Sequence, residues 1–361
     1  MTNFDHHLGT QPVPPAQAFD EAALAHWLAR HVADFQGPLR VEAFKGGQSN
    51  PTYKLITPRQ CYVMRSKPGA KAQLLPSAHA IEREYAVMRG LAHTQVPVPE
   101  MLCLCEDESV IGRAFYIMTF MSGRILWDQS LPGMSPTERA DIYDEMNRVL
   151  ALLHRVDMAA CGLSQYGKPG NYFERQISRW SKQYQASITQ PITEMDRLMD
   201  WLPAHMPAMA NDPTLVSIVH GDYRLDNLMF HPTEPRVIAV LDWELSTLGH
   251  PLADFSYHCM GWHIPPGAFR GIGGLDLAAL GIPDEATYIR QYCARTGFAS
   301  PEQLAQDWNF YLAYNLFRMA AILQGIGKRI EAGTAASAQA ISAAAGARPL
   351  AQLAWQFAQK K

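Results

Sequence analysis

The amino-acid sequence predicts an α+β protein with a small, strand-rich N-terminal lobe and a larger, mainly helical C-terminal lobe. Short apolar runs separated by turn residues, a pattern typical of strands, crowd the first 121 residues. Helical periodicity dominates after that point, interrupted by only two strand-like runs. With 361 residues, the chain is long enough for one such two-lobed domain. We expect a flexible tail at 1–19, an N-terminal lobe at 20–121 and a C-terminal lobe at 122–361.

The N-terminal lobe is expected to contain an antiparallel sheet with one helix packed on it. Residues 20–33 place Leu24 and Trp27 on one face of a helix that precedes the sheet. A second helix is expected over 78–92, and the prolines that follow Val96 stop it. The strands are expected near 39–45, 52–56, 61–65, 100–105 and 114–121.

The C-terminal lobe opens with a clear helix-start signal. Ser135-Pro-Thr-Glu138 combines a capping box with proline at the first helical position. Ile142, Met146 and Leu150 then continue one apolar helical face. Further helices are expected near 171–187, 194–204, 284–296, 301–330 and 334–358, and strands at 216–219 and 237–241.

The composition limits which kinds of molecule the protein is expected to bind and in which cellular compartment it is expected to lie. The 31 basic and 34 acidic residues give a net charge of −3, so no overall basic field points to nucleic acid or to an anionic membrane. The apolar runs fall below the roughly 18 residues needed to span a bilayer, and the N-terminus has no apolar core of a signal peptide. The six cysteines form no C-x-x-C pair. We therefore expect a cytoplasmic protein that binds neither nucleic acid nor membranes.

The strongest chemical signal is the segment His220-Gly-Asp222-Tyr-Arg-Leu-Asp-Asn227. Phosphoryl transfer to an alcohol needs a carboxylate that orients the hydroxyl and accepts its proton. Asp222 and Asn227 have the spacing of the base and the metal-binding amide in a kinase catalytic loop. Arg224 could place a cation on the transferred phosphoryl group. The structural alternative is a turn whose polar side chains only satisfy backbone groups.

A second acidic signal follows the strand-like run 237–241. Asp242 lies just past that run, where a kinase holds its metal-binding aspartate, and Glu244 is a weaker candidate. Carboxylate and carbonyl oxygens are the ligands that Mg²⁺ takes in proteins. Asn227 and Asp242 are therefore the expected magnesium ligands. The alternative, in which Asp242 caps the next segment, is less favoured because both motifs occur in the kinase order.

These motifs resemble the aminoglycoside phosphotransferase family, which includes choline kinase-like enzymes. The segments His220-Gly-Asp222 and Asp242-Trp-Glu244 carry the resemblance, together with Gly249-His-Pro-Leu-Ala-Asp254. It covers roughly residues 40 to 330. In detail the chain is most similar to the branch found fused to, or encoded beside, acyl-CoA dehydrogenases, through Gly47-Gln-Ser-Asn-Pro51 and the run from Val240 to Pro251. The resemblance implies a bilobal protein kinase-like fold and a transferase that uses ATP and Mg²⁺.

The resemblance also identifies nucleotide-binding residues. A glycine-rich turn between two strands lets backbone N–H groups approach phosphate oxygens, although such a turn alone is more often just a hairpin. The cation aligned with the kinase lysine is Arg65, a departure from the family, and Lys67 is the alternative. Glu84 on the following helix is the expected partner of Arg65, and backbone groups at 119–121 are expected to bind adenine. The cofactor-binding residues are thus Gly46, Gly47, Ser49, Asn50, Arg65, Glu84, Thr119 and Met121.

Three histidines near this region could suggest a metal site with Asp254. His250 precedes a proline and His258 lies in an apolar stretch, so core or turn roles are favoured for them, and His263 is discounted with them. Asp254 itself is expected to anchor the catalytic loop through hydrogen bonds.

The acceptor is expected to be a small hydroxylated molecule. The closest branch implies a hydroxy acid or a hydroxyacyl-CoA and a functional link to an acyl-CoA dehydrogenase, whereas the wider family implies aminoglycosides or choline. Three alternatives stay open: a catalytically inactive nucleotide-binding scaffold, favoured by Arg65; an aminoglycoside- or choline-type phosphotransferase; and a metal-dependent hydrolase. The intact set of Asp222, Asn227 and Asp242 argues against the scaffold.

Overall fold

The computed structural model describes residues 9–45, 50–69, 80–267, 270–333 and 338–360. They form two compact units, each assembled from separate stretches of chain. The first contains Met1–Trp127, Ala159–Tyr166 and Asp226–Leu245, and the second contains Asp128–Met158, Gly167–Leu225 and Ser246–Lys361. Because both units are discontinuous in sequence, the division into lobes at residue 121 stays a prediction.

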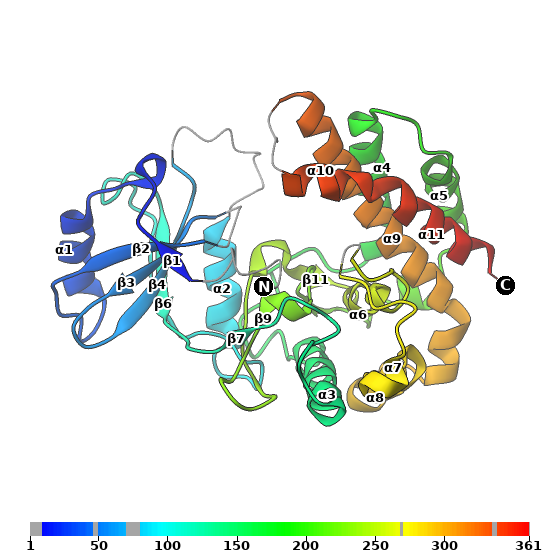
Figure 1. Cartoon of the computed structure of the whole chain (residues 1–361), viewed down its shortest axis with the longest axis horizontal. Helices are drawn as coiled ribbons and strands as arrows, with labels where there is room; N and C mark the ends of the chain where they lie inside the picture. The colour runs from blue at the N-terminus through cyan, green and yellow to red at the C-terminus, as the bar shows by residue number, and fades with distance from the viewer. Residues whose placement is uncertain (1–8, 46–49, 70–79, 268–269, 334–337, 361) are drawn as a thin grey trace. The chain divides into compact units, whose positions relative to one another are not determined.

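A six-stranded antiparallel sheet dominates the first unit (Figure 1). Every pairing between neighbouring strands is antiparallel, as expected from the sequence. The strand order is β1-β2-β3-β4-β6-β5. The strands are β1 (Thr10–Gln11), β2 (Arg40–Phe44), β3 (Thr52–Ile56), β4 (Cys61–Ser66), β5 (Met101–Cys105) and β6 (Phe115–Thr119).

Part of the segment expected as a flexible tail is ordered. Thr10 and Gln11 pair with Phe44 and Ala43 of β2. Arg113 also donates hydrogen bonds to the carbonyl oxygens of residues 17 and 18. These contacts join residues that are far apart in sequence, and a local pattern does not reveal such partners.

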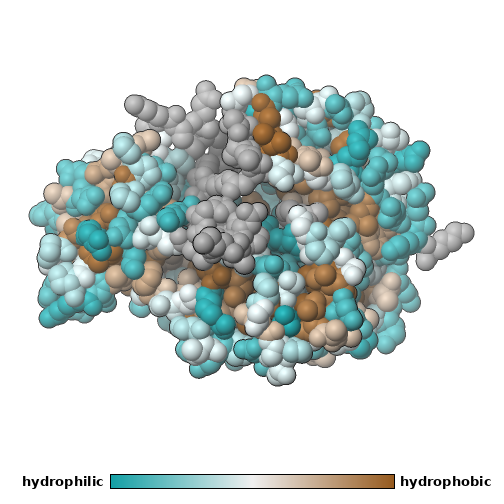
Figure 2. Space-filling model, viewed as in Figure 1, coloured by the Kyte–Doolittle hydropathy of each residue, from teal (hydrophilic) through white to brown (hydrophobic). Residues whose placement is uncertain are grey.

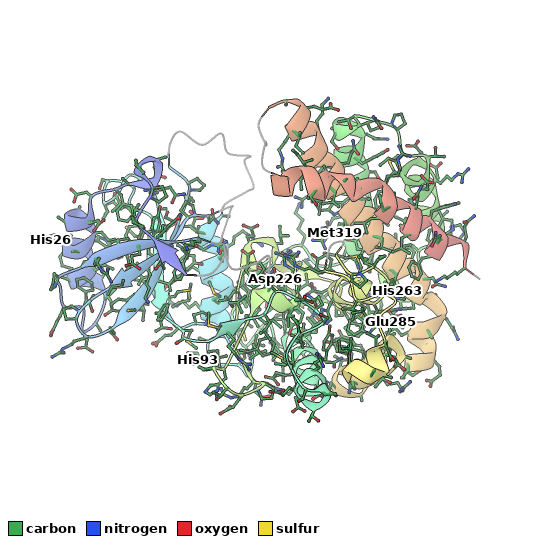
Figure 3. The ribbon with its side chains drawn as sticks, in the orientation of Figure 1. His26, His93, Asp226, His263, Glu285 and Met319 are labelled. Carbon is green, nitrogen blue, oxygen red and sulfur yellow. The ribbon has the colours of Figure 1, made fainter. Side chains whose placement is uncertain are left out.

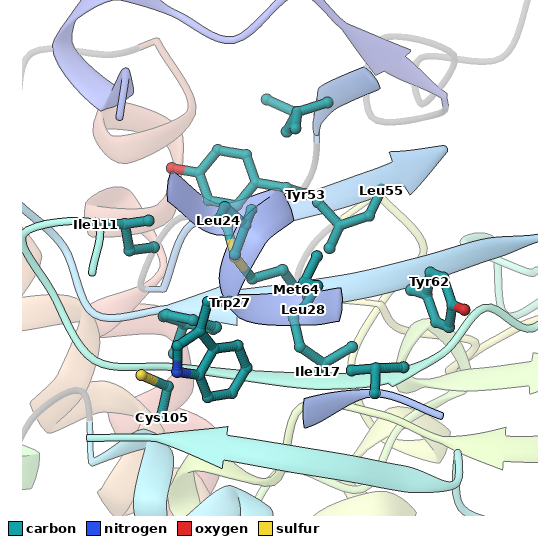
Figure 4. Close-up of a cluster of buried hydrophobic side chains, with 14 residues drawn as sticks. Leu24, Trp27, Leu28, Tyr53, Leu55, Tyr62, Met64, Cys105, Ile111 and Ile117 are labelled. Carbon is teal, nitrogen blue, oxygen red and sulfur yellow. The ribbon is translucent and has the colours of Figure 1, made fainter. Parts of the chain in front are cut away.

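Two helices cover opposite faces of the sheet (Figure 1). Side chains alternate between faces along a strand, so Tyr62 and Met64 of β4 face one way and Arg65 the other. Helix α1 (Glu21–His31) buries Leu24, Trp27 and Leu28 on the first face, where the main apolar cluster of this unit lies (Figure 4). Helix α2 (Ile81–Leu91) packs against β5 and β6 on the other face.

The first unit also contains a short three-stranded sheet, in the order β10-β9-β7. Strands β9 (Leu228–Phe230) and β10 (Val237–Val240) form an antiparallel hairpin in which Leu228 lies opposite Val240. Strand β7 (Arg124–Ile125) pairs with β9. This hairpin positions the residues that come just before β9 and just after β10.

The second unit is mainly helical, as expected. Two strands, β8 (Ser217–Val219) and β11 (Thr247–Gly249), pair antiparallel. The helices are α3 (Pro136–His154), α4 (Tyr172–Ser187), α5 (Thr193–Ala204), α6 (Pro251–Cys259), α7 (Leu277–Leu280), α8 (Glu285–Thr296), α9 (Pro301–Glu331), α10 (Ala338–Ala345) and α11 (Ala347–Gln359). Helices α3, α4, α5, α8 and α9 begin and end close to the expected residues, whereas α6 and α7 were not expected, and the capping box at Ser135 is present.

The sequence pattern missed α6, although this helix carries residues of the site. All nine of its residues are buried, so no polar face marks a helical period. The tail expected as one helix over 334–358 contains two helices in its described part, with Gly346 between α10 and α11.

The surface mixes hydrophilic and hydrophobic residues (Figure 2). Across the described residues, no helix combines the length and the apolar character that crossing a membrane would require.

The three discounted histidines have packing and capping roles in the second unit. His250 caps the N-terminus of α6 through Leu252 N–H and contacts the Met209 carbonyl oxygen. His258 pairs with the Tyr288 hydroxyl. His263 lies beside Glu285, 2.9 Å away (Figure 3). Within the described parts of the chain, no group of three histidine, cysteine or acidic side chains could hold a metal ion.

The buried histidines make stability depend on pH. Burial lowers the pKa of His250 to about 4 and that of His258 to about 4. In the unfolded chain, a histidine binds a proton as the pH falls below its ordinary pKa of about 6.5. In the folded chain, His250 and His258 stay neutral until the pH approaches 4, so the unfolded state binds more protons between these pH values. The free energy of unfolding should therefore fall as pH drops from 6.5 to 4.

We predict that His250→Asn flattens this pH dependence by about one proton, or about 1.4 kcal/mol per pH unit. Asparagine keeps a capping acceptor for α6 but does not titrate. The measurement is denaturant unfolding at several pH values between 6.5 and 4.5. His205→Asn, a change at an exposed position, should leave the slope as in wild type, and an equal effect of both variants would contradict the prediction.

Candidate nucleotide-binding and catalytic site

A buried arginine organises the acidic side chains of the first unit. Arg65 lies on β4, and its side chain is 12% exposed. Its guanidinium forms ion pairs with three carboxylates: Glu84 (Nε to Oε2, 3.0 Å), Asp242 (Nη2 to Oδ1, 2.9 Å) and Glu244 (Nη2 to Oε2, 3.6 Å). Burial opposes the charge on Arg65, but these carboxylates outweigh burial and raise its pKa. The expected pair of Arg65 and Glu84 is therefore present.

Glu84 is held in place from several sides. It is 1% exposed on α2, and the Asn50 side-chain amide donates to its Oε1 over 2.8 Å. The Tyr116 hydroxyl donates to its Oε2 over 3.2 Å. Burial raises the pKa of the Glu84 carboxyl, and the charge of Arg65 opposes that rise. Asn50, expected at the phosphates, thus orients the partner of the buried cation; Gly46, Gly47 and Ser49 lie outside the described residues.

Lys67 belongs to a separate, more exposed ion pair. Its Nζ contacts Glu82, and the two side chains are 29% and 30% exposed. The difference in exposure follows from the end of β4 at Ser66: Arg65 lies within the strand, whereas Lys67 lies just beyond it. Of the two candidate cations, Arg65 is the one that contacts Asp242.

The hairpin of β9 and β10 brings the two expected metal ligands to the same end. Asn227 directly precedes β9, and its carbonyl oxygen accepts a hydrogen bond from Leu241 N–H over 2.9 Å. Asp242 follows at the end of β10 with a φ of 64°, a left-handed conformation that is uncommon outside glycine. Strained backbone of this kind is concentrated at functional sites.

The chemistry of these side chains fits a magnesium ion. The side chains of Asp242 and Glu244, which are 32% and 26% exposed, supply carboxylate oxygens, and the buried Asn227 supplies an amide oxygen. Such hard oxygen donors suit Mg²⁺. Three carboxylates surround one guanidinium, and their surplus negative charge also favours a divalent cation.

One expected adenine contact is already used within the sheet. Thr119 N–H donates to the carbonyl oxygen of Glu100, and the Thr119 hydroxyl accepts from Glu100 N–H. Thr119 is the last residue of β6 and its N–H group is engaged by that bond, whereas the role expected of its carbonyl oxygen stays a prediction. The role expected for Met121 stays a prediction.

The second unit holds the expected catalytic carboxylate. Asp222 lies in the loop after β8 and contacts two side chains: the Tyr257 hydroxyl donates to its Oδ1 over 2.5 Å, and Arg224 Nη2 lies 3.3 Å from its Oδ2. Burial and the neighbouring Asp222 raise the pKa of Tyr257, so its hydroxyl keeps the proton that it donates. The carboxylate is therefore held between a phenol and a cation.

Asp254 anchors the turn that carries Asp222, as the sequence predicted. This buried carboxylate of α6 accepts hydrogen bonds from His220 N–H (2.7 Å) and Gly221 N–H (2.9 Å). His154 of α3 contacts the same carboxylate over 3.3 Å. Burial acts to raise the pKa of Asp254, but the bonds from His154 and His220 outweigh burial and hold the pKa below its usual value. Gly221 has a φ of 81°, which favours glycine at this turn.

A pocket in the second unit adjoins Arg224. Aromatic and aliphatic side chains form much of its wall, and the pocket residues for which the structure gives side chains include no carboxylate. Two arginines are the charged groups of its lining. The lining includes Arg224, Arg270, Tyr143, Tyr257, Trp262 and Ile264.

Sequence reasoning missed two residues that contact the catalytic loop. Tyr257 lies on α6, the helix without a polar face. Arg318 lies on α9 and donates to the Gly221 carbonyl oxygen over 2.6 Å. A signal for Arg318 was available, because it is the one charged residue in the mostly apolar run 308–323.

Comparisons with known proteins show which family and fold this chain shares. The phosphotransferase enzyme family matches residues 40–304. A solved structure from Ralstonia eutropha JMP134, described as a candidate aminoglycoside phosphotransferase, is 64% identical with a TM-score of 0.87 and covers 95% of this chain and 100% of its own. Choline kinase from Cryptosporidium parvum shares the fold alone, with 11% identity, a TM-score of 0.65 and coverage of 94% and 95%.

The curated relatives are longer proteins. Mouse acyl-CoA dehydrogenase family member 10 is 45% identical over 367 residues, which cover 100% of this chain and 33% of that protein. The chain spans less than half the length of the first curated relatives that it matches. The chain therefore belongs to the phosphotransferase enzyme family, with the protein kinase-like fold of its aminoglycoside phosphotransferase and choline kinase neighbours.

Proposed function

We propose that this protein is an ATP- and Mg²⁺-dependent kinase that phosphorylates the hydroxyl group of a hydroxy acid or of its CoA thioester. The observation that carries the proposal is the held carboxylate of Asp222, on a loop anchored by Asp254. The acidic set at Arg65, which a scaffold would not need, supports catalysis over mere nucleotide binding.

Asp222 is the general base of the proposed reaction. The acceptor oxygen forms a bond to the γ-phosphorus of ATP while the bond from that phosphorus to the bridging oxygen of ADP breaks. The hydroxyl proton passes to the Asp222 carboxylate, and ADP leaves with the bonding electrons. Arg224, beside Asp222, offsets negative charge on the transferred group.

Residues of the first unit bind the nucleotide in this proposal. Arg65 contacts phosphate oxygens from a position fixed by Glu84. Asn227 and Asp242 would hold the magnesium ion, which supplies positive charge at the phosphate oxygens. The names of related structures mention ADP and AMP-PNP bound to an aminoglycoside phosphotransferase, in line with a nucleoside triphosphate as the donor.

The pocket beside Arg224 supports an anionic acceptor. Its volume of about 30 Å³ admits one small group of the acceptor, and Arg224 and Arg270 in its lining suit a carboxylate or a phosphate oxygen. An aminoglycoside carries several positive charges and would meet these arginines unfavourably. The names of the curated relatives support a functional link to an acyl-CoA dehydrogenase, which we include in the proposal.

We predict that removal of the inner ion pair weakens ATP binding more than removal of the outer pair. The matched double variants are Arg65→Gln/Glu84→Gln and Lys67→Gln/Glu82→Gln, and each removes one positive and one negative charge. The inner variant should lose about tenfold in affinity, corresponding to about 1.4 kcal/mol, and the outer variant should stay within threefold. Titration calorimetry with ATP and Mg²⁺ measures both. A larger loss in the outer variant would transfer the phosphate contact to Lys67.

The assigned roles of base and metal ligand predict different defects. Asp222→Asn should bind ATP nearly as wild type but lose about 10²–10⁴ in turnover, because it removes the general base. Asp242→Ala should instead weaken nucleotide binding that depends on magnesium. The measurements are ATP titrations with and without Mg²⁺ and phosphoryl transfer to hydroxy acids and 2-, 3- and 4-hydroxyacyl-CoAs. Normal turnover of Asp222→Asn would disprove the mechanism; nucleotide binding without any transfer by wild type would favour the scaffold.

The acceptor pocket predicts a charge preference. Arg270→Gln should raise KM for anionic hydroxyacyl acceptors about tenfold and leave KM for ATP unchanged, since the removed cation faces the acceptor pocket. Arg290→Gln, at an exposed position on α8, is the matched control and should behave as wild type. Faster transfer to an aminoglycoside or to choline than to any acid of the panel would refute an anionic acceptor.

A further inference from the structure

The turn that carries Asp222 has two contacts whose purpose the assigned roles leave unexplained. Arg318 of α9 donates a hydrogen bond from Nη2 to the Gly221 carbonyl oxygen over 2.6 Å. Tyr257 of α6 donates from its hydroxyl to Asp222 Oδ1 over 2.5 Å. The guanidinium of Arg318 also lies 5.2 Å from the centre of the Tyr257 ring, so the two side chains contact each other as well as the loop.

Arg318 is an unusual charge to bury. It is 6% exposed, and among the described residues no ion pair joins it to a carboxylate. Its contacts are the Gly221 carbonyl oxygen and the rings of Tyr257 and Trp180, the latter 5.7 Å away. Its Nε has no hydrogen-bond partner. Burial acts to lower the pKa of Arg318, but the neighbouring tyrosines and the charge of Asp222 outweigh burial and raise it, so the guanidinium stays charged beside the turn.

The geometry gives the arginine a purpose at the catalytic loop. Asp254 holds the turn through the N–H groups of His220 and Gly221, and Arg318 holds the opposite polar group, the Gly221 carbonyl oxygen. The turn is thus fixed from both α6 and α9. Tyr257, stacked under Arg318, then fixes the side chain that the turn carries.

We propose that Arg318 and Tyr257 are positioning residues for the general base, an inference that rests on the proposed function. Tyr257 donates to Oδ1 of Asp222 and Arg224 lies 3.3 Å from Oδ2, so the phenol fixes the rotation of the carboxylate that receives the proton of the acceptor hydroxyl. Arg318 contacts both the Tyr257 ring and the Gly221 carbonyl oxygen and so fixes their positions relative to each other. A base held in one orientation lowers the entropic part of the activation barrier. Loss of either contact should therefore lower turnover and leave the affinity for substrates unchanged.

The first test removes one hydroxyl group. Tyr257→Phe keeps the ring under Arg318 but cannot hold Asp222. We expect kcat for transfer to the hydroxyacyl-CoA panel to fall at least tenfold, with KM for ATP and for the acceptor within twofold of wild type. Tyr184→Phe is the matched control: it removes another buried hydroxyl of the same unit, which accepts from Ile192 N–H, and should keep the wild-type kcat.

A double-mutant cycle separates positioning from general packing. If Tyr257 acts through Asp222, then Tyr257→Phe should cost almost nothing further in the Asp222→Asn background. Additive losses would overturn the inference, and so would a wild-type kcat for Tyr257→Phe. If wild type transfers phosphoryl to no acceptor of the panel, the proposed function fails. Additive losses in a wild type that does transfer phosphoryl overturn the inference alone.

The second test examines the cation. Arg318→Met should lower kcat at least tenfold, and Arg318→Lys, which restores a charged donor, should recover part of that loss. Unfolding midpoints measured for both variants identify a folding defect. If Arg318→Met does not fold, Arg318→Lys is compared with wild type. Lysine keeps the charge but lacks the planar fork, so the inference expects a lower kcat for Arg318→Lys, and a wild-type kcat would contradict it. An increase in the KM of the acceptor at constant kcat would overturn positioning in favour of substrate binding.

Discussion

The buried guanidinium of Arg65 is the interaction on which the first unit depends. A single charge in the interior is unfavourable, so it requires carboxylates close by, and these come from α2 and from the segment after β10. The ion pairs thereby tie the sheet, its covering helix and the hairpin of β9 and β10 into one arrangement. Because Asp242 contacts Arg65 and is also a proposed metal ligand, the same contact links the proposed nucleotide-binding residues to the proposed metal site.

The second unit uses two buried charges for one short turn. Asp254 accepts from its N–H groups, and Arg318 donates to its carbonyl oxygen, so the backbone at Gly221 is held from both sides. His154 contacts Asp254, and aromatic rings cover Arg318. Such contacts are expected of a site that must hold the proposed base, Asp222, in one orientation.

Arginine in place of the usual kinase lysine at position 65 keeps the positive charge and changes the number of nitrogen atoms that can contact carboxylates. A guanidinium has several donors in a fixed plane, so it reaches Glu84 through Nε and Asp242 and Glu244 through Nη2. A lysine has one nitrogen for the same purpose. Arg65, the residue that favoured an inactive scaffold in the sequence, is thus paired with all three carboxylates, Glu84, Asp242 and Glu244.

The sequence by itself determined the order of most elements and identified candidates for the chemical residues. Alternating strand patterns and capping signals are local, so the strands near 52–56 and 61–65 and the helix that starts after Ser135 were predictable. Motif spacing identified Asp222, Asn227 and Asp242 as candidates, and their roles stay predictions. The tertiary structure alone decided which of two cations pairs with Glu84, how Tyr257 and Arg318 meet the catalytic loop, and that Thr119 N–H is used within the sheet. Helix α6 escaped prediction because it is buried on all sides and has no periodic polar face. These features depend on contacts between distant segments, and local pattern carries no information about which segments will meet.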